Sequence, residues 1–465
     1  MRSKVPPISP GPPSGPPLPP AVGRLLQHPR VLTLAQAHGR QAAAAAVRSA
    51  LEEVRAGGPD APGGTEEEIA DRAGRLLDGA PRRLRRVING TGVIIHTNLG
   101  RAPIAPQAAA RAAELAAGYT NLELDLATGR RGDRQSLLAD LLRRLSGVEA
   151  ALVVNNGAAA VLLGLSALCR GREVLVSRGE AIEIGGGFRI PDILRLSGAR
   201  LVEVGTTNRT RVSDYEQACS DRTAAFLRVH QSNFRMSGFT ERPELSPLAS
   251  AAHRHGALLL EDAGSGLIPP PPKGARAEVR LGRSWAHGAD LIFCSGDKLL
   301  GASQAGLILG RADLVERLRR HPLARALRPD KLQLAALEQT LLSLEEPEGL
   351  TQVPVWRMLR AEPRQLRRRA DGWADRLRAQ GLAVEVVETA GAVGGGTTPG
   401  EPLPSYGIEV ACSQPGVVRR RLLAAEPAVL CLERPRGIVV DARCVLPGED
   451  GPLLAALAAA LAPRP

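Results

Sequence analysis

Lys298 and Asp262 are the two residues of this sequence whose types and spacing point most directly to chemistry. Lys298 follows a strand-like apolar run at 291–294, as expected for a lysine at the mouth of a strand. Asp262 stands 36 residues earlier, just after a second apolar run at 256–260. A lysine that burial has desolvated can lose its proton and condense with a carbonyl group, which is Schiff-base chemistry.

The same pair meets the needs of a pyridoxal phosphate enzyme. Lysine binds the aldehyde of the cofactor, and an acidic partner keeps the pyridine nitrogen protonated, so that the ring withdraws electrons from the substrate. Asn156, Gly157 and Ala158 offer a phosphate site, because they stand between a strand-like run and an alanine-rich helix whose first backbone N–H groups are free. We therefore predict pyridoxal 5'-phosphate, covalently bound to Lys298.

Each of these signals has a simpler explanation when it is taken alone. A lysine after an apolar run is usually a solvated loop residue, and the Asp262 to Gly264 segment has the form of a common turn. The order of the three elements carries the prediction, because the phosphate turn comes first, then the aspartate, then the lysine within roughly 40 residues of it.

The elements that must position these residues alternate along the chain from Val87 onward. Short β-rich runs alternate with helical stretches, which predicts an α/β fold with a mainly parallel central sheet. Ligands bind such sheets at the carboxyl ends of the strands, where Asn156, Ser232, Asp262 and Lys298 all fall. The predicted strands are 148–154, 173–177, 200–204, 224–230, 257–261, 291–294 and 305–309.

Four segments of different composition predict the domain organisation. Residues 1–20 are rich in proline and predict a disordered lead, and 21–80 show helical periodicity. We expect a large catalytic domain at 81–350 and a smaller α/β domain at 351–465, which contains a glycine-rich stretch near 391–400.

Composition sets wider limits on function. The 465 residues, 44% of them apolar, can build a large core, and the net charge of +12 is compatible with nucleic-acid contact or with a merely arginine-rich surface. The six cysteines show no metal-ligand or disulfide spacing, which predicts no metal site and a reducing, cytoplasmic location. Residues 150–169 carry no charge, but Asn155-Asn156-Gly157 breaks the run, so we expect no membrane span.

Several longer motifs resemble those of bacterial selenocysteine synthase, the L-seryl-tRNA(Sec) selenium transferase family. The resemblance runs from about Leu25 to the C-terminal helix and is highly specific. It rests on Ile88-Asn-Gly-Thr-Gly-Val-Ile-Ile-His-Thr-Asn-Leu-Gly-Arg101, Gly118-Tyr-Thr-Asn-Leu-Glu-Leu-Asp125, Glu183-Ile-Gly-Gly-Gly-Phe-Arg-Ile-Pro-Asp192, His230-Gln-Ser-Asn-Phe-Arg235, Ser295-Gly-Asp-Lys-Leu-Leu-Gly301, Arg325-Ala-Leu-Arg328 and Gly394-Gly-Gly.

The resemblance implies a fold-type-I pyridoxal phosphate enzyme that converts seryl-tRNA(Sec) into selenocysteinyl-tRNA(Sec). The reaction would use selenophosphate and pass through a cofactor-bound aminoacrylyl stage. It also implies that the helical domain at 21–80 binds the selenocysteine tRNA, that the chain forms a homo-oligomer of ten copies, and that the selenophosphate synthetase is a candidate partner.

The resemblance also extends the set of site residues. Ser232 and Ser295 join the cofactor site, and Asp297 becomes a proton shuttle for the leaving hydroxyl, although the sequence alone equally allows a local cap. Arg325 and Arg328 lie one helical turn apart and would otherwise be a solvated helix face. With Arg101, they become the expected site for the selenophosphate anion, because planar guanidinium groups bind such oxyanions bidentately.

The sequence departs from the family pattern at two places, and two other functions remain as alternatives. Gly157 replaces the usual third asparagine of the phosphate turn, and Gly132-Asp133-Arg134 replaces Gly-Ser-Arg. One rival is a related pyridoxal phosphate lyase that acts on a free amino acid or an amino-sugar acid without tRNA. The other is a catalytically silent tRNA-binding protein, which the presence of Asp262, Ser295 and Lys298 disfavours.

Overall fold

The computed structural model of the chain describes residues 20–56, 65–78, 84–185, 187–272, 275, 278–397 and 402–462. The chain forms two compact units, Met1–Arg85 and Arg86–Pro465. The predicted disordered lead at 1–20 lies outside the described residues except for Pro20.

The first unit is helical where it is described. Leu25, Val47 and Ile69 are fully buried and hold its helices together, because each helix presents one apolar stripe to the others. The last helix begins with a capping box, in which the Thr65 hydroxyl accepts from the Glu68 N–H and the Glu68 carboxylate accepts from the Thr65 N–H. The helices are α1 (Val22–Leu25), α2 (Pro29–His38), α3 (Arg40–Ala56) and α4 (Glu66–Asp78).

The second unit is built on a seven-stranded sheet in the order β3-β11-β10-β9-β8-β4-β7. The strands are β3 (Ala150–Val154), β4 (Glu173–Ser177), β7 (Arg200–Val204), β8 (Thr223–Val229), β9 (Leu258–Asp262), β10 (Leu291–Ser295) and β11 (Gly306–Gly310). Only β11 runs antiparallel to its neighbours, because no crossover helix separates it from β10. The predicted α/β fold with a mainly parallel sheet is confirmed, with every strand boundary within two residues.

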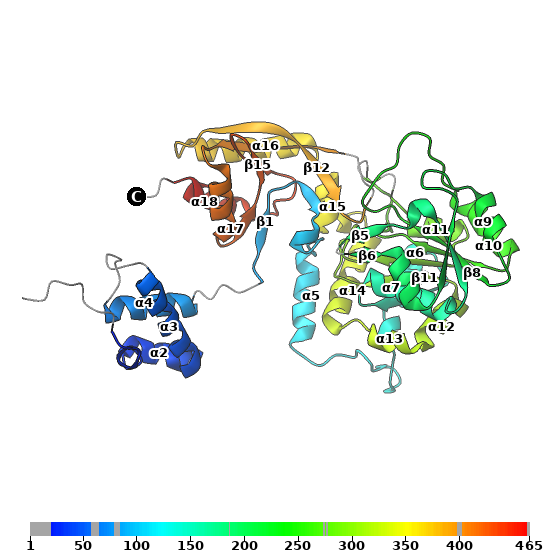
Figure 1. Ribbon diagram of the computed structural model, residues 1–465, viewed down its shortest axis with the longest axis horizontal. Coiled ribbons are helices and arrows are strands. Elements are labelled where there is room, and N and C mark those ends of the chain that lie inside the picture. The colour runs from blue at the N-terminus through cyan, green and yellow to red at the C-terminus, as the bar shows by residue number, and fades with distance from the viewer. Residues whose placement is uncertain are drawn as a thin grey trace, which may run out of the picture. The chain divides into compact units, whose positions relative to one another are not determined.

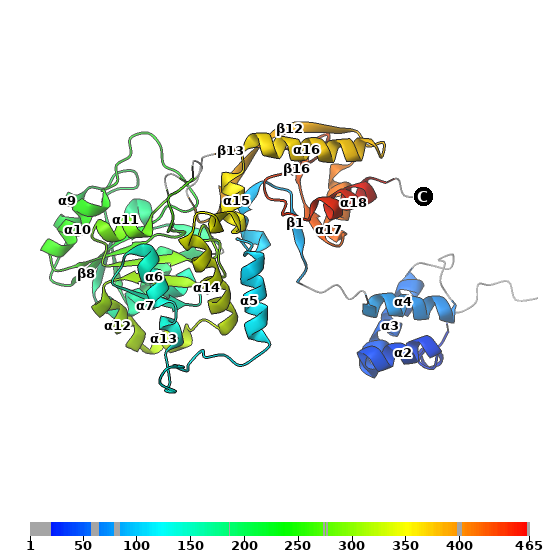
Figure 2. The ribbon, with the colours of Figure 1, turned by 180° about the vertical axis from the view of Figure 1, so that it is seen from behind.

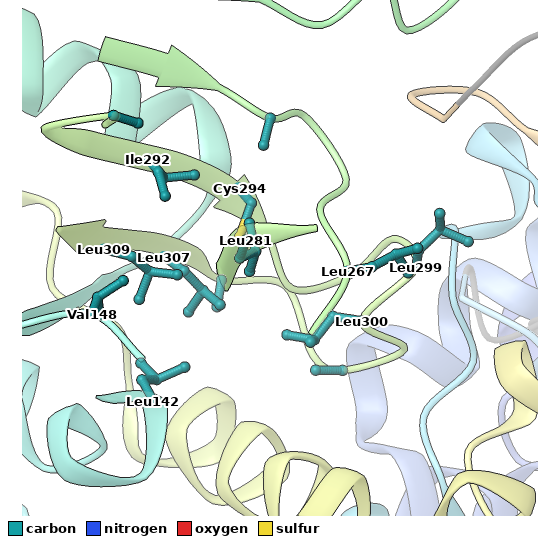
Figure 3. Packing of buried hydrophobic residues seen from close by; sticks show 14 of the residues in the cluster. Leu142, Val148, Leu267, Leu281, Ile292, Cys294, Leu299, Leu300, Leu307 and Leu309 are labelled. Carbon is teal, nitrogen blue, oxygen red and sulfur yellow. The ribbon is translucent and has the colours of Figure 1, made fainter. Parts of the chain in front are cut away.

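Helices cover both faces of this sheet and form two layers (Figures 1 and 2). Leu152 and Val154 face one layer, whereas Ala151 and Val153 face the other, as the two-residue period of a strand requires. Figure 3 shows part of the second layer's core. The first layer contains α7 (Gly157–Leu168), α8 (Ile190–Ser197), α12 (Ala312–Arg320) and α13 (Pro322–Ala326); the second contains α6 (Ala139–Ser146), α9 (Val212–Ala218), α10 (Leu245–Arg254), α11 (Leu281–Ala286), α14 (Lys331–Glu345) and α15 (Pro354–Arg360).

A further helix and a hairpin flank this core. Helix α5 (Pro106–Ala116) packs along α14, and a small hairpin joins β5 (Glu183–Gly185) to β6 (Phe188–Arg189). No helix in the described ranges is both long and apolar enough to cross a membrane.

A second sheet, in the order β15-β16-β13-β12-β2, forms the smaller lobe. Its strand β2 (Val93–Ile95) comes from the segment that the sequence assigns to the large domain, and it pairs in parallel with β12. Strand β1 (Val87–Asn89) likewise pairs with β14 (Ala428–Leu430), so a segment of the predicted large domain contributes two strands to the sheets of the smaller lobe. The other elements are β12 (Val384–Gly394), β13 (Leu403–Ala411), β15 (Leu432–Arg434), β16 (Gly437–Asp441), α16 (Pro363–Arg378), α17 (Pro415–Ala424) and α18 (Asp450–Leu461).

Candidate active site

A cavity of about 550 Å³ lies where strands β3, β9 and β10 end. The sequence predicts a ligand at this edge of the sheet, and the cavity brings together most of the predicted site residues. Its lining includes Arg101, Asn156, Gly157, Ala158, Asp262, Ser295 and Lys298.

Lys298 lies in the turn between β10 and β11 and is only 6% exposed. The next two residues, Leu299 and Leu300, are buried in the core, and the Leu299 N–H donates to the Ser265 hydroxyl at 3.0 Å, which fixes the turn. Burial lowers the pKa of Lys298 below its ordinary value, and the negative charge of Asp262 opposes this shift. The turn therefore presents an amine that is easier to deprotonate than a solvated lysine.

Asp262 ends β9 and is buried on the same cavity. Its Oδ1 atom accepts a hydrogen bond from the Gly264 N–H at 2.9 Å. Burial raises the pKa of Asp262, while the charge of Lys298 and the Gly264 N–H act in the opposite direction. A buried carboxylate in this position is strongly stabilised by a cationic partner, which a protonated pyridine nitrogen would supply.

The amino terminus of α7 forms a third part of the wall. Asn156 is the N-cap, and its side chain accepts from the Ala159 N–H at 2.8 Å. The preceding N–H groups of Gly157 and Ala158 have no acceptor within the helix, as at every helix start, so this end of the cavity favours an anion. A Cβ atom at Gly157 would lie 2.3 Å from the Ser295 hydroxyl, so a larger residue at this position would require the Ser295 side chain to move.

The smaller lobe supplies a wall that the sequence did not predict. Gly395 and Gly396 follow β12 and line the cavity, and the Gly396 N–H donates to the Ser232 carbonyl at 3.0 Å. A Cβ atom at Gly396, where φ is +83°, would lie 2.6 Å from the Lys298 Nζ atom. The Ser232 hydroxyl is buried and has no hydrogen-bond partner among the described residues, as expected of a group that a ligand would satisfy.

Arg101 and Asp297 form an ion pair at the cavity, with 2.8 Å between Nη1 and Oδ2. The side chain of Arg101 is 34% exposed and that of Asp297 is 9% exposed. The family resemblance implies anion binding for Arg101 and proton transfer for Asp297, but it does not imply their pairing.

His230 and Glu278 are further buried groups near Lys298, and neither is among the site residues predicted from the sequence. His230 follows β8, its N–H donates to the Asp262 carbonyl at 2.9 Å, and its Nε2 atom lies 3.7 Å from Glu278 Oε2. Burial, with the charges of Arg242 and Lys298, lowers the pKa of His230 to about 4. The signals that could have indicated the place of His230 are its position at the end of a predicted strand and at the start of a motif that resembles the family's.

Replacing His230 with asparagine should flatten the acid side of the stability profile. Between pH 6.5 and about 4 the unfolded chain binds a proton at His230 that the folded chain does not, so wild-type stability falls as the pH falls. The slope of the unfolding free energy should lose at most about 1.4 kcal/mol per pH unit in the variant, measured by urea unfolding at each pH. His255→Asn, at an exposed histidine, should keep the wild-type slope, and equal slopes in all three proteins would contradict the assignment.

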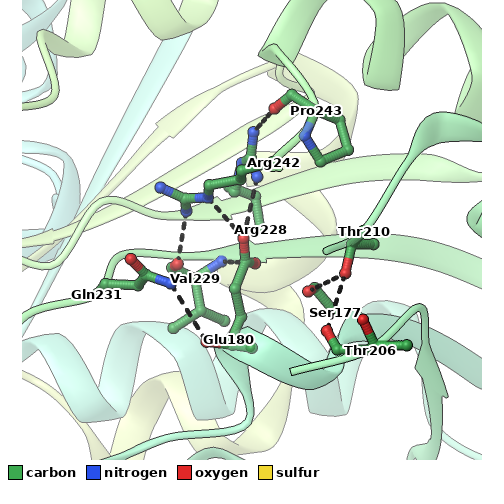
Figure 4. A network of polar contacts seen from close by, with 10 residues as sticks. Ser177, Glu180, Thr206, Thr210, Arg228, Val229, Gln231, Arg242 and Pro243 are labelled. Atoms are coloured by element: carbon green, nitrogen blue, oxygen red, sulfur yellow. Dashed lines mark hydrogen bonds and ion pairs between the residues drawn. The ribbon is translucent and has the colours of Figure 1, made fainter. Parts of the chain in front are cut away.

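A buried polar network holds the segment that carries His230 and Ser232 (Figure 4). Glu180 accepts from Arg228 Nη1 at 2.9 Å, from Arg242 Nε at 2.7 Å and from the Val229 N–H at 2.8 Å. Burial alone would raise the pKa of Glu180, but Arg242 and Arg228 hold it below its ordinary value. The network therefore anchors the end of β8 through an ionised carboxylate with matched donors.

The structure places Arg325 and Arg328 away from the cavity that holds Lys298. They line a second cavity of about 390 Å³ with Asp133, Gln135 and Arg320 among its other residues. Arg328 also contacts Glu123, with 3.3 Å between Nη1 and Oε1. Within one copy of the chain, Arg101 and this arginine pair therefore belong to different cavities, and their joint role stays a prediction.

The chain matches known proteins along nearly its whole length. The family model described as L-seryl-tRNA selenium transferase matches residues 87–446, and one described as selenocysteine synthase N terminal matches residues 20–55. The L-seryl-tRNA(Sec) selenium transferase of Moorella thermoacetica is 44% identical over 95% of this chain and 96% of its own length. The corresponding transferase of Nitratidesulfovibrio vulgaris is 46% identical over 88% of this chain and 89% of its own length.

Among solved structures, D-glucosaminate-6-phosphate ammonia-lyase superposes with a TM-score of 0.59. It is 20% identical and covers 81% of this chain and 96% of its own, so the likeness concerns the fold.

The cavity fits pyridoxal phosphate on its own chemistry. Lys298 offers an amine for the aldehyde, Asp262 offers a carboxylate for the ring nitrogen, and the start of α7 offers a site for the phosphate. All three line the same cavity. The cavity and the sequence matches agree, and they confirm the family that the motifs indicated. The chain belongs to the L-seryl-tRNA selenium transferase family.

Proposed function

We propose that this chain converts seryl-tRNA(Sec) into selenocysteinyl-tRNA(Sec), with selenophosphate as selenium donor and pyridoxal phosphate bound covalently to Lys298. The observation that carries the proposal is the single cavity shared by Lys298, Asp262 and the start of α7, in a chain that matches selenium transferases over 95% of its length. The experiment that tests it offers seryl-tRNA(Sec) and radiolabelled selenophosphate to the purified enzyme. Selenium should appear in the tRNA fraction, and its absence there would contradict the proposal.

The residues divide the chemistry among them. When bound, pyridoxal phosphate withdraws electrons from the α-carbon of the esterified serine. Lys298 holds the cofactor and then removes the α-proton, for which its lowered pKa suits it. Asp262 would keep the ring nitrogen protonated, and Asp297, next to Lys298 in the chain, would carry the proton to the leaving hydroxyl.

The selenophosphate site is proposed to combine residues of two copies of the chain. Arg101 lies in the cavity with Lys298, whereas Arg325 and Arg328 line another cavity beside the segment 117–138. That segment exposes Tyr119 completely and Leu126 by 73%, as expected of a surface that a second copy covers. A homo-oligomer, decameric as the family resemblance implies, would then bring the three arginines to one anion.

The tRNA is proposed to bind the helical first unit. Arg40, Arg48 and Arg55 lie exposed on one side of α3, because at about 100° per residue their spacings place them within an arc of about 80°. None of the three has an ion pair within the part of the chain that the structure describes, so their charges are available to phosphates. Other arginines of this unit, such as Arg24 and Arg30, pair with carboxylates.

Replacing Arg40, Arg48 and Arg55 together with glutamine should weaken tRNA binding by at least about tenfold, since each contact to a phosphate releases a counterion. The slope of log affinity against log salt should become shallower by about 2 to 3. Filter binding over a salt series measures both quantities. A control variant replaces Arg24, Arg30 and Arg72, which are all ion-paired, and should bind almost normally. An equal loss of tRNA affinity in the two variants would show that tRNA binds another surface.

The rival function, a lyase acting on a free amino acid or amino-sugar acid, has less support. The structural likeness to an amino-sugar phosphate lyase is at 20% identity and concerns the fold alone. Turnover of free serine or an amino-sugar acid at rates above those with seryl-tRNA(Sec) would favour the lyase.

A further inference from the structure

The Arg101–Asp297 ion pair places a carboxylate on a guanidinium group that the proposed function assigns to the selenium donor. We propose that Asp297 competes with the incoming oxyanion for Arg101, so that donor binding breaks the ion pair and releases Asp297 beside Lys298. The inference rests on the proposed role of Arg101 in donor binding. It adds that Arg101 is also a positioning residue for Asp297 while the donor is absent.

The backbone of Arg101 is fixed independently of its side chain. Arg101 has a φ of +66°, in the left-handed region that residues with side chains rarely adopt. Two hydrogen bonds hold this conformation, one from the Arg101 N–H to the His96 carbonyl at 3.0 Å and one from the Ala102 N–H to the Asp297 carbonyl at 3.1 Å. The guanidinium group can therefore change partner while the main chain stays in place.

The ion pair with Asp297 uses only one of the hydrogen-bond donors of the Arg101 guanidinium group. Its contact with Asp297 runs through a single donor, Nη1, whereas a guanidinium group presents a planar fork for two parallel hydrogen bonds. The Asp297 Oδ1 atom is buried and has no hydrogen-bond partner among the described residues. A multiply charged oxyanion can engage the fork with two oxygens, so it is a stronger partner than the carboxylate it displaces.

Charge makes the two partners mutually exclusive. The Asp297 carboxylate is mostly shielded from water, so an anion at Arg101 would stand close to a second negative charge with little screening. The exchange relieves this repulsion by moving the carboxylate away or by giving it a proton. The arrival of the donor thereby becomes the event that frees a proton-carrying group next to Lys298.

Binding of inorganic phosphate to the cofactor-loaded enzyme tests the exchange. Asp297→Asn keeps the shape of the side chain but removes the competing charge, so phosphate should bind about tenfold more tightly by calorimetry, a difference of about 1.4 kcal/mol. Glu278→Gln is the matched control, because Glu278 is also a buried carboxylate whose charge acts on Lys298, and its ion pair is with His230. It should change the affinity by less than about twofold. Arg101→Ala should abolish this binding.

The other outcomes would refute either the exchange at Arg101 or the role of Arg101 in donor binding. Equal tightening in the Asp297 and Glu278 variants would mean a general effect of negative charge and would refute the exchange. Unchanged binding in Asp297→Asn, with binding lost in Arg101→Ala, would refute the exchange but leave the proposed function intact. Unchanged binding in Arg101→Ala would refute the donor role of Arg101 itself. Asp297→Ser removes the same charge and gives the same test if the asparagine variant folds poorly.

Discussion

Lys298→Ala is expected to abolish both covalent cofactor attachment and selenium transfer, with activity falling by at least about 10³-fold, because the same amine binds the aldehyde and removes the α-proton. Borohydride reduction followed by mass spectrometry of the intact chain measures the attachment. The wild-type chain should gain the mass of the reduced cofactor, and the variant should not. Cofactor absorbance in the visible range should change in parallel.

Lys331→Ala is the matched control for this experiment. Lys331 is half-buried and donates hydrogen bonds to the carbonyls of Ala116 and Gly118, away from the cavity that holds Lys298. That variant should keep the borohydride-dependent mass increase. A mass increase that persists in Lys298→Ala would place the attachment on another residue and would reject the proposed site.

Arg328→Ala is expected to weaken selenophosphate use by about 10- to 150-fold, since a charge-assisted contact to an anion contributes about 1.5 to 3 kcal/mol. Exchange of the substrate α-proton with solvent, followed by mass spectrometry, should stay near normal because it depends on Lys298. Lysine at this position should recover part of the loss, as it keeps the charge but lacks the fork. Arg320→Ala is the control, because Arg320 lines the same cavity but pairs with Glu316.

The same variant tests whether the site is shared between copies. Chains with Lys298→Ala and chains with Arg328→Ala should regain activity when they are mixed and allowed to exchange subunits, because one composite site then has both residues. Mixtures that stay inactive would show that each copy uses its own arginine. Loss of tRNA binding in Arg328→Ala, with normal use of selenophosphate, would instead assign this arginine to the tRNA surface.

Local sequence patterns were sufficient to predict the sheet and the part of the site that lies on it. Asn156, Asp262 and Lys298 each follow an apolar run, and parallel strands bring such positions to one edge. The ends of the apolar runs also indicated the strand boundaries, because each strand is buried between two helical layers and is therefore apolar along its whole length. These features depend on neighbours in the sequence and could therefore be derived from it.

The remaining features of the site depend on contacts between distant segments. Gly396 reaches Lys298 only because β12 pairs with β2, and no residue pattern near either glycine or lysine encodes that approach. Arg101 takes a left-handed backbone conformation that propensity argues against, and the hydrogen bonds to the His96 and Asp297 carbonyls hold it. Arg325 and Arg328 show the opposite case, where a resemblance named residues that one copy of the chain does not bring to the cavity.

The pairing of β2 with β12 also affects the order in which the chain can fold during synthesis. Val93 pairs with Ala392, which the ribosome adds roughly 300 residues later. At synthesis rates of about 5 to 20 residues per second, Ile94 and Ile95 must wait about 15 to 60 s for the strand that covers them. Both side chains are fully buried in the finished protein, so the nascent chain exposes an apolar strand for that time. Its early segment is therefore a natural client for chaperones during translation.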